Sequence, residues 1–273
     1  MKKLVILSAL LVLLAACGSK QEPSENSSAE VSPSTSETKS NSSSNPATSS
    51  SKTNSTKSSS EESSTAESQT SSSEEADAFS ELTEAYPKVK MPQKLPRDES
   101  LFLNIAAVGD KKELSVLYYN MTEALVMNHN ALNQQTPFAS FKKTTYDTAA
   151  KAKEAVNYQY DDGGQKVDLS HNIEGYQQSG AGSTYLNWKE GNWSLVVRAS
   201  NVLGQEPVTT AKEVVNYLEE AFLPVPKSVG QITIDLSAAG YQATTVIWQE
   251  EKVVYAVSHE DPLPALEMAV SVE

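Results

Sequence analysis

Two stretches of the chain share one pattern, and that pattern decides the fold: TYLNWKEGNWSLVVRASN at residues 184–201 and TTVIWQEEKVVYAVSHED at residues 244–261. Each alternates apolar and polar residues on both sides of a short polar turn, which is typical of a β-hairpin. The turns are predicted at residues 190–192 and 250–252. The residue types match at Trp188 and Trp248, Glu190 and Glu250, and Val197 and Val257.

The alternation gives each predicted hairpin one apolar row. The rows consist of Leu186, Trp188, Trp193, Leu195 and Val197 in the first, and Val246, Trp248, Val253, Tyr255 and Val257 in the second. A shift of one residue would turn a whole row to the other face of the sheet. We therefore expect both rows to lie on a shared core, with Trp188 and Trp248 as equivalent core anchors.

A helix is predicted after each hairpin. The first starts at the capping box Thr210–Glu213, and the second starts at Asp261 with Pro262 in its first turn. The first helix is expected to bury Val214, Val215, Leu218 and Phe222, and the second carries the apolar residues Leu263, Leu266, Ala269 and Val270. A looser third copy is expected from strands at 113–119 and 138–144 and a helix at 148–158.

The remaining elements complete one predicted domain over residues 76–273. Phe79, Leu82 and Tyr86 recur at helical spacing before Pro87, and an extended connector follows at 91–96. Further strands are expected at 102–108, 167–173 and 231–236. The predicted fold class is α+β: a mostly antiparallel, curved sheet with two to three helices packed on one face, built from repeated strand-turn-strand-helix units.

The N-terminus carries an export signal. Lys2 and Lys3 precede an apolar run at 4–14 that is too short for a comfortable membrane span, and the small residues Ala15 and Ala16 follow. We therefore assign 1–16 as a signal peptide. Leu14-Ala15-Ala16-Cys17 resembles the lipobox of bacterial lipoproteins, which implies cleavage before Cys17 and a diacylglycerol anchor, such as one carrying palmitate, on its sulfur. An ordinary signal peptide with a chance cysteine is the alternative.

Residues 17–75 form the predicted tether, with the lipidated Cys17 at its start. Ser and Thr dominate it, and Val31 is its one large apolar residue after Cys17. Such a segment buries too little to offset the entropy of ordering, so we expect it to be disordered. It is either a passive spacer or a glycosylated stalk that threads the wall.

Composition excludes several classes of function. The formal charge of −13 argues against binding to nucleic acid or to an anionic lipid surface, because both require clustered Lys and Arg. Cys17 is the single cysteine, so the domain has no disulfide, thiol nucleophile or cysteine metal site.

The stretches 182–193 and 211–223 resemble a family of uncharacterised lipoproteins of Gram-positive bacteria, and the resemblance covers the domain from about residue 85. It implies an extracytoplasmic location and carries no activity. More loosely, the expected curved sheet with helices is similar to periplasmic lipoprotein carriers and sensor domains.

Few residues offer chemistry. His129, His171 and His259 lack the context of a catalytic triad, so we expect no catalytic residue. Carboxylates at Asp161, Asp162 and Asp168 flank Gly163-Gly164 and could hold a hard cation, but the same sequence is a good hairpin turn, which we favour over metal binding. Residues 180–183 are expected to be a connector. The aromatic side chains of Trp188, Trp193, Trp248, Tyr185 and Tyr255 could line a sugar or peptide groove, although core packing is favoured for the tryptophans.

We therefore expect a lipid-anchored protein on the extracytoplasmic side of the cell membrane. Its domain is predicted to be a non-catalytic binding or interaction module of the envelope, without cofactor, whose partner is a protein or an envelope polymer. A sensor lipoprotein acting on a membrane partner is the alternative, and a wall or peptide hydrolase is a third reading.

Overall fold

A computed structural model of the protein describes residues 71–273, which belong to one compact unit. The expected signal peptide, Cys17 and the tether up to residue 70 lie outside the described residues. The helices are α1 (Ser71–Ala85), α2 (Ala149–Ala155), α3 (Pro207–Leu218) and α4 (Pro262–Val270), with a short 3-10 helix at Asn130–Gln134. Helix α1 includes residues 71–75, which composition assigned to the tether. No helix within 71–273 has the length and apolar character needed to cross a membrane.

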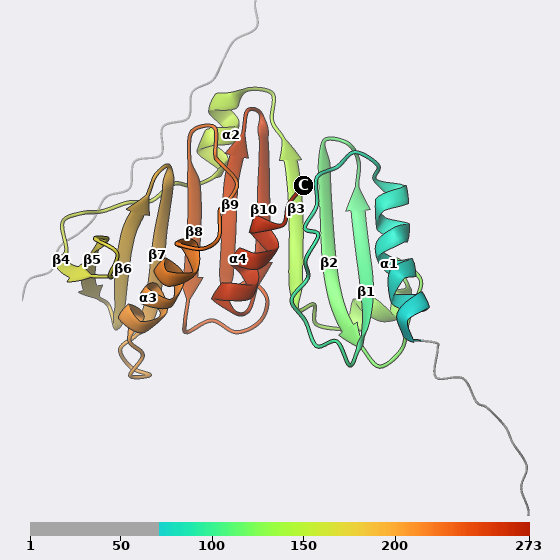
Figure 1. The fold of residues 1–273 in the computed structure, drawn as a ribbon, viewed down its shortest axis with the longest axis horizontal. Coiled ribbons are helices and arrows are strands. Elements are labelled where there is room, and N and C mark those ends of the chain that lie inside the picture. Colours follow the sequence, from blue (N-terminus) through green and yellow to red (C-terminus); the bar gives the residue numbers. More distant parts are fainter. Residues whose placement is uncertain (1–70) are drawn as a thin grey trace, which may run out of the picture. The chain divides into compact units, whose positions relative to one another are not determined.

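Ten strands form one sheet (Figure 1). The strands are β1 (Phe102–Gly109), β2 (Glu113–Met121), β3 (Ala139–Thr145), β4 (Gln165–Asp168), β5 (Glu174–Gly180), β6 (Ser183–Glu190), β7 (Trp193–Ser200), β8 (Gly230–Asp235), β9 (Thr244–Glu250) and β10 (Val253–His259). Their order in the sheet is β1-β2-β3-β10-β9-β8-β7-β6-β5-β4. Neighbours are antiparallel except β7 and β8, which are parallel. The predicted α+β class with a mostly antiparallel sheet is confirmed.

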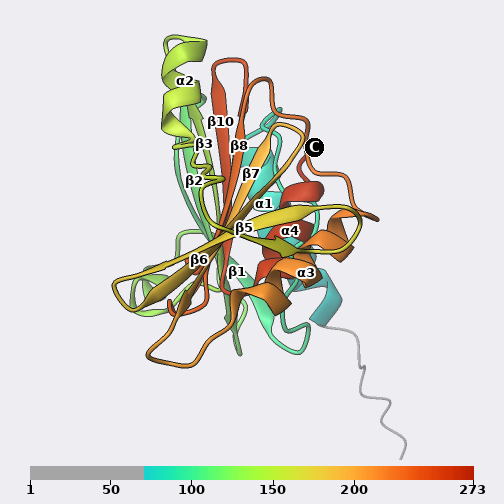
Figure 2. The ribbon, with the colours of Figure 1, turned by 90° about the vertical axis from the view of Figure 1, so that its left-hand side faces the viewer.

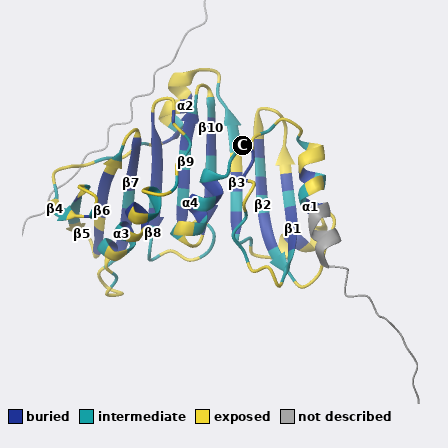
Figure 3. Ribbon diagram, viewed as in Figure 1, coloured by how far each residue is buried: buried dark blue, intermediate teal, exposed yellow. Residues whose placement is uncertain are grey.

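The sheet is strongly twisted, as sheets of L-residues are. Figure 2 shows β5 and β6 running across the direction of β8 and β10. Burial is greatest along the central strands, while turns and loops are exposed (Figure 3). Because of the twist, the two ends of the sheet turn their faces in different directions.

The helices occupy both faces of the sheet. Leu82 of α1, Val214 of α3 and Leu266 of α4 lie in the main core with one row of strand residues. Helix α2 packs in a second cluster, formed by Ala152, Val156, Val229 and Val254. Val254 and its neighbour Tyr255 belong to different clusters because successive strand residues point to opposite faces. The predicted placement of the helices on one face is therefore not confirmed.

Both predicted hairpins are present with the predicted turns, β6–β7 and β9–β10. Trp188 and Trp248 are completely buried. Each indole Nε1–H donates to the glutamate two residues later, at 2.8 Å from Trp188 to Glu190 Oε1 and at 3.4 Å from Trp248 to Glu250 Oε1. A buried indole needs such a partner, and the strand supplies one from the next residue on the same face.

The looser third copy is not found. In the runs β5-β6-β7 and β8-β9-β10, the last strand in sequence lies on the side of the sheet nearer β1. In the run β1-β2-β3, the last strand lies on the side farther from β1, next to β10. The run β1-β2-β3 thus crosses the sheet in the opposite direction from the other two runs. Helix α2, which follows β3, packs on the opposite face of the sheet from α3 and α4.

The strand predicted at 167–173 is present only at residues 167–168, which end β4, and the rest is the turn of the hairpin between β4 and β5. Ser170, His171 and Asn172 have positive φ values of 74°, 50° and 61°. Leu169, completely buried, anchors the turn in the main core. The residues predicted as a connector at 180–183 include the β5–β6 turn, where Ala181 and Gly182 also have positive φ.

Helix α3 begins one turn earlier than its capping box predicts. Its N-cap is Glu206 and Pro207 stands in the first turn, where the fixed φ of proline suits a helix. The helix ends at Leu218, so Phe222 lies beyond it and is 86% exposed. The prediction that Phe222 is buried is therefore wrong. Helix α4 begins at Pro262 with Asp261 as its N-cap, as predicted.

A segment after α1, residues 88–94, pairs with residues 271–273, and we call it the strap. The backbone N–H of Met91 donates to the Glu273 carbonyl at 3.0 Å, and that of Gln93 donates to the Ser271 carbonyl at 3.0 Å. Met91 is buried in the main core. Next to it in the strap, Lys90 Nζ lies 3.1 Å from Glu250 Oε2.

Candidate functional site

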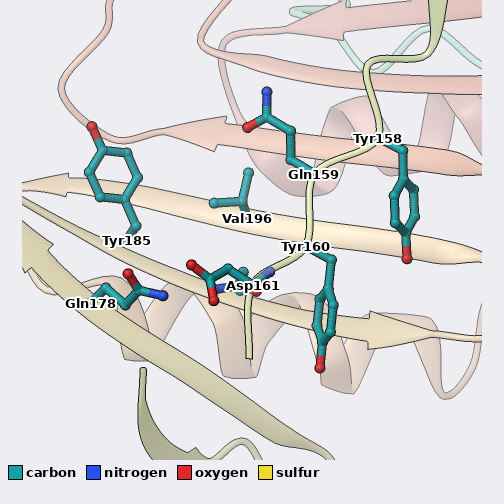
Figure 4. A pocket seen from close by; sticks show the side chains of 8 residues that line it. Tyr158, Gln159, Tyr160, Asp161, Gln178, Tyr185 and Val196 are labelled. Carbon is teal, nitrogen blue, oxygen red and sulfur yellow. Dashed lines mark hydrogen bonds between the residues drawn. The ribbon is translucent and has the colours of Figure 1, made fainter. Parts of the chain in front are cut away.

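A pocket of about 430 Å³ lies where the connector after α2, residues 157–164, crosses β5, β6 and β7 (Figure 4). Its lining is polar and aromatic: Tyr158, Gln159, Tyr160, Asp161, Gln178, Tyr185, Asn187 and Val196. Four of these residues come from the connector and four from the strands. The pocket is therefore a product of the topology.

Strand alternation explains which residues face the pocket. On β6, Leu186 and Trp188 point into the main core, so Tyr185 and Asn187 point to the other face. On β7, Leu195 and Val197 are core residues and Val196 faces the pocket. One face of the β6–β7 hairpin thus places its tryptophans in the core, and the other face lines the pocket.

Side chains of the sheet hold the connector in place. The backbone N–H of Gln159 donates to Gln231 Oε1 at 2.8 Å, and the N–H of Asp161 donates to Asn187 Oδ1 at 3.0 Å. The Ser194 hydroxyl donates to the Gln159 carbonyl. Gly164 passes so close to β5 that a Cβ would stand 2.5 Å from the Gln177 carbonyl oxygen. These contacts fix the backbone that carries Tyr158 and Tyr160.

The Tyr160 ring is held by its neighbours. Lys189 Nζ lies 3.6 Å from the ring centroid, a cation–π contact, and Tyr176 meets the ring edge to face at 6.2 Å. Burial raises the pKa of Tyr158 and Tyr160. Both tyrosines therefore keep their hydroxyl protons at neutral pH and offer them as hydrogen-bond donors.

Asp161 is the carboxylate of the pocket. A hydrogen bond from the Gln178 side chain, followed by one from the backbone N–H of Gly163, lowers the pKa of Asp161. The second bond is 2.8 Å long. Asp161 is therefore ionised at neutral pH and accepts hydrogen bonds from a ligand.

Arg198, the cross-strand partner of Tyr185, brings a cation near the pocket, but Asp235 neutralises it. Arg198 Nη1 donates to the two carboxylate oxygens of Asp235 at 2.7 and 3.0 Å, and Nη2 donates to Ser183 Oγ at 3.0 Å. The pocket thus presents hydroxyls, amides and one carboxylate, which suit an uncharged polar ligand.

The histidines lie elsewhere in structural roles. His129 caps the 3-10 helix, His171 Nε2 lies 2.9 Å from Asn216 Oδ1, and His259 Nδ1 accepts the Asp261 backbone N–H at 2.9 Å. None of them lines the pocket, and within 71–273 the lining contains no nucleophile paired with a base.

The hairpin turn predicted at residues 161–164 is not found. These residues belong to the connector between α2 and β4, in which Asn157 has positive φ and the Gly163 N–H donates to Asp161 Oδ1. Of the three candidate carboxylates, only Asp161 lines the pocket; Asp162 and Asp168 do not. In the described part of the chain, no group of three His, Cys, Asp or Glu residues gathers to hold a metal ion.

Of the five aromatic residues considered for a ligand groove, only Tyr185 lines the pocket, with 41% of its surface exposed. Trp188, Trp193, Trp248 and Tyr255 are buried in the main core. Sequence reasoning missed Tyr158, Tyr160 and Gln178. The sequence Tyr158-Gln159-Tyr160 after a helix could have indicated a site. Which residues it faces depends on the sheet topology.

Comparison with protein-family models, with curated proteins and with solved structures yields no match.

Proposed function

We propose that this protein is a lipid-anchored extracytoplasmic lipoprotein whose domain is a non-catalytic binding module for an envelope carbohydrate. The lipobox-like sequence that ends at Cys17 supports the anchor, and the pocket beneath the connector supports the ligand class. The pocket is the observation that carries the proposal.

Its lining matches the chemistry of sugars. Tyrosine rings offer flat apolar surfaces with a polar edge, which suit the apolar face and the hydroxyls of a pyranose ring. The planar amides of Gln159, Gln178 and Asn187 and the carboxylate of Asp161 offer both donors and acceptors. A few well-placed polar groups on an aromatic surface are typical of small-ligand sites.

We also infer that the domain contains two copies of a strand-turn-strand-helix unit, β6-β7-α3 and β9-β10-α4. In support, each second strand occupies the same side of its hairpin, each helix begins with proline, and each buried tryptophan bonds to the glutamate two residues later. The first copy supplies Tyr185, Asn187 and Val196 to the pocket.

The proposal is tested by titrating the mature chain, made soluble by Cys17→Ser, with a β-1,4-linked N-acetylglucosamine tetrasaccharide and with neutral hexose tetrasaccharides. We expect saturable binding to at least one glycan and a tenfold or greater loss of affinity, on the order of 1.4 kcal/mol, in Tyr185→Ala and in Gln178→Ala. Isothermal titration calorimetry measures both.

Tyr241→Ala removes a tyrosine outside the pocket and should leave glycan affinity unchanged. An absence of binding to every glycan at millimolar concentration, or binding that survives Tyr185→Ala, would contradict the carbohydrate site.

A further inference from the structure

A second hollow of about 420 Å³ lies at the turn end of the first hairpin, away from the tyrosine pocket. It opens between the β6–β7 turn and the segment that follows α3. We call it the turn groove, and its lining includes Glu190, Trp193, Leu218, Phe222, Leu223 and Val225. The groove has an apolar wall and one half-buried acidic group.

The apolar wall is open to solvent. Phe222 and Val225 are each 86% exposed, although a large side chain of this kind normally gains free energy from burial. Among the described residues, the backbones of Phe222, Leu223 and Val225 find no hydrogen-bond partner. Exposed apolar side chains beside backbone groups without a partner form a surface on which another peptide segment can pair.

Glu190 supplies the acidic group. Its side chain is half-buried, and its Oε1 accepts the Trp188 indole N–H. None of the ion pairs found within 71–273 includes Glu190. Burial raises the pKa of Glu190, and nearby Glu219 raises it further. A half-buried carboxylate beside a second acidic residue attracts a cation.

The corresponding place in the second unit is already filled. There the strap lays Lys90 against Glu250, with Lys90 Nζ at 3.1 Å from Glu250 Oε2. The next residue, Met91, is 2% exposed and pairs its backbone with Glu273, just beyond α4. The strap thus gives the second glutamate its cation and gives the segment after the second helix its backbone partner.

We infer that the turn groove binds an extended segment of a partner protein that presents a lysine to Glu190 beside an apolar residue. The segment would do for the first unit what residues 88–94 do for the second. The inference rests on the proposed pair of units and is independent of the carbohydrate pocket. A lysine is the matching group because Glu190, Glu219 and Glu220 give this end of the unit an acidic character.

A peptide with the strap's own sequence, YPKVKMPQKLP from residues 86–96, is the probe. Labelled with a fluorophore, it is titrated into the soluble mature chain carrying Cys17→Ser, and binding is followed by fluorescence anisotropy. We expect saturable binding, weakened about fivefold or more in Glu190→Gln and in Phe222→Ser. The glutamine can still accept the indole N–H, so Glu190→Gln keeps the hairpin's hydrogen bond.

Two matched changes separate binding in the turn groove from binding elsewhere on the domain. Glu251→Gln alters an exposed glutamate at the turn of the second hairpin and should leave peptide affinity unchanged. Tyr185→Ala should also leave it unchanged, so failure of the carbohydrate proposal does not affect this one. A peptide with both valine-flanking lysines, the equivalents of Lys88 and Lys90, changed to glutamine should bind as weakly as the unaltered peptide binds Glu190→Gln.

The inference is overturned if the strap peptide does not bind, or if it binds Glu190→Gln as tightly as the parent. It is equally overturned if Glu250→Gln abolishes binding while Glu190→Gln does not, because the peptide would then be displacing the strap from the second unit.

Discussion

Trp188 and Trp248 each place an indole ring in the core and direct its N–H to a glutamate at the end of the same strand. In each hairpin, one tryptophan side chain therefore provides both buried apolar surface and a hydrogen bond. Removal of the ring leaves a large cavity and takes away a partner of the glutamate, and the two losses add in the same direction.

We expect Trp188→Ala and Trp248→Ala each to lower the free energy of unfolding by about 3–5 kcal/mol, because both rings are completely buried. Urea titration followed by circular dichroism measures the change. Tyr185→Ala, at a partly exposed aromatic residue, should cost less than about 1 kcal/mol. Near-native stability of both tryptophan variants would disprove their role as core anchors.

His259 makes the stability of the fold depend on pH. Burial lowers the pKa of His259 below its ordinary value of 6.5, against smaller opposing effects of Asp261 and Glu260 and of backbone hydrogen bonds. The unfolded chain therefore binds a proton at higher pH than the folded chain does. The contribution of His259 is complete above pH 6.5 and is lost as the pH falls through the lowered pKa.

Denaturant titrations between pH 7.5 and 5 measure this effect. Stability of the parent protein should fall with pH by more than that of His259→Asn, in which the amide oxygen can still accept the Asp261 N–H. Parallel pH profiles for the two proteins would show that His259 does not contribute.

At the scale of elements, sequence periodicity is informative where one face of a strand is buried. Both long hairpins and their turns follow from alternation, because Leu186, Trp188 and their counterparts must face the core. Strand β5, EGYQQSG, was not predicted because it has few apolar residues and lies near the sheet edge. The late end predicted for α3 failed because Pro224 and Pro226 follow, and the chain leaves the helix before Phe222.

The candidate site was much less predictable than the hairpins. Tyr185 and Asp161 were singled out from the sequence, but as an aromatic residue and a turn carboxylate with no connection between them. They meet because the connector after α2 crosses the reverse side of β6, a contact that depends on Gln231 and Asn187 holding its backbone. The sequence around Gln231 or Asn187 gives no indication that these side chains bind the connector.

Neighbouring residues of the strap contribute unequally to the stability of the fold. We expect Met91→Ala to cost about 2–5 kcal/mol, because Met91 is buried in the core. Lys90→Ala should cost about 0–1 kcal/mol, because its ion pair with Glu250 is largely exposed. Thermal or urea unfolding distinguishes the two, and slow hydrogen exchange at Met91 and Gln93 would show that the backbone pairing persists in solution. Equal effects of both substitutions would contradict this division.

For the whole molecule, the formal charge of −13 favours solubility over adhesion to anionic surfaces, so the proposed membrane attachment depends on the proposed lipid at Cys17. We expect labelled palmitate to follow the protein in cells and the protein to fractionate with membranes. Cys17→Ser should abolish both. Labelling and membrane fractionation that persist in Cys17→Ser would disprove the anchor.

The position of β3 beside β10 also governs when this domain can finish folding. Phe141 pairs with Val257, and Met91 pairs with Glu273. During synthesis, the first three strands can form a meander, but the β3 edge of that meander stays unpaired until β10 has emerged. A polypeptide made from its N-terminus therefore keeps an open edge at β3 until β10 has formed, and the strap gains its backbone partners only when residues 271–273 are in place.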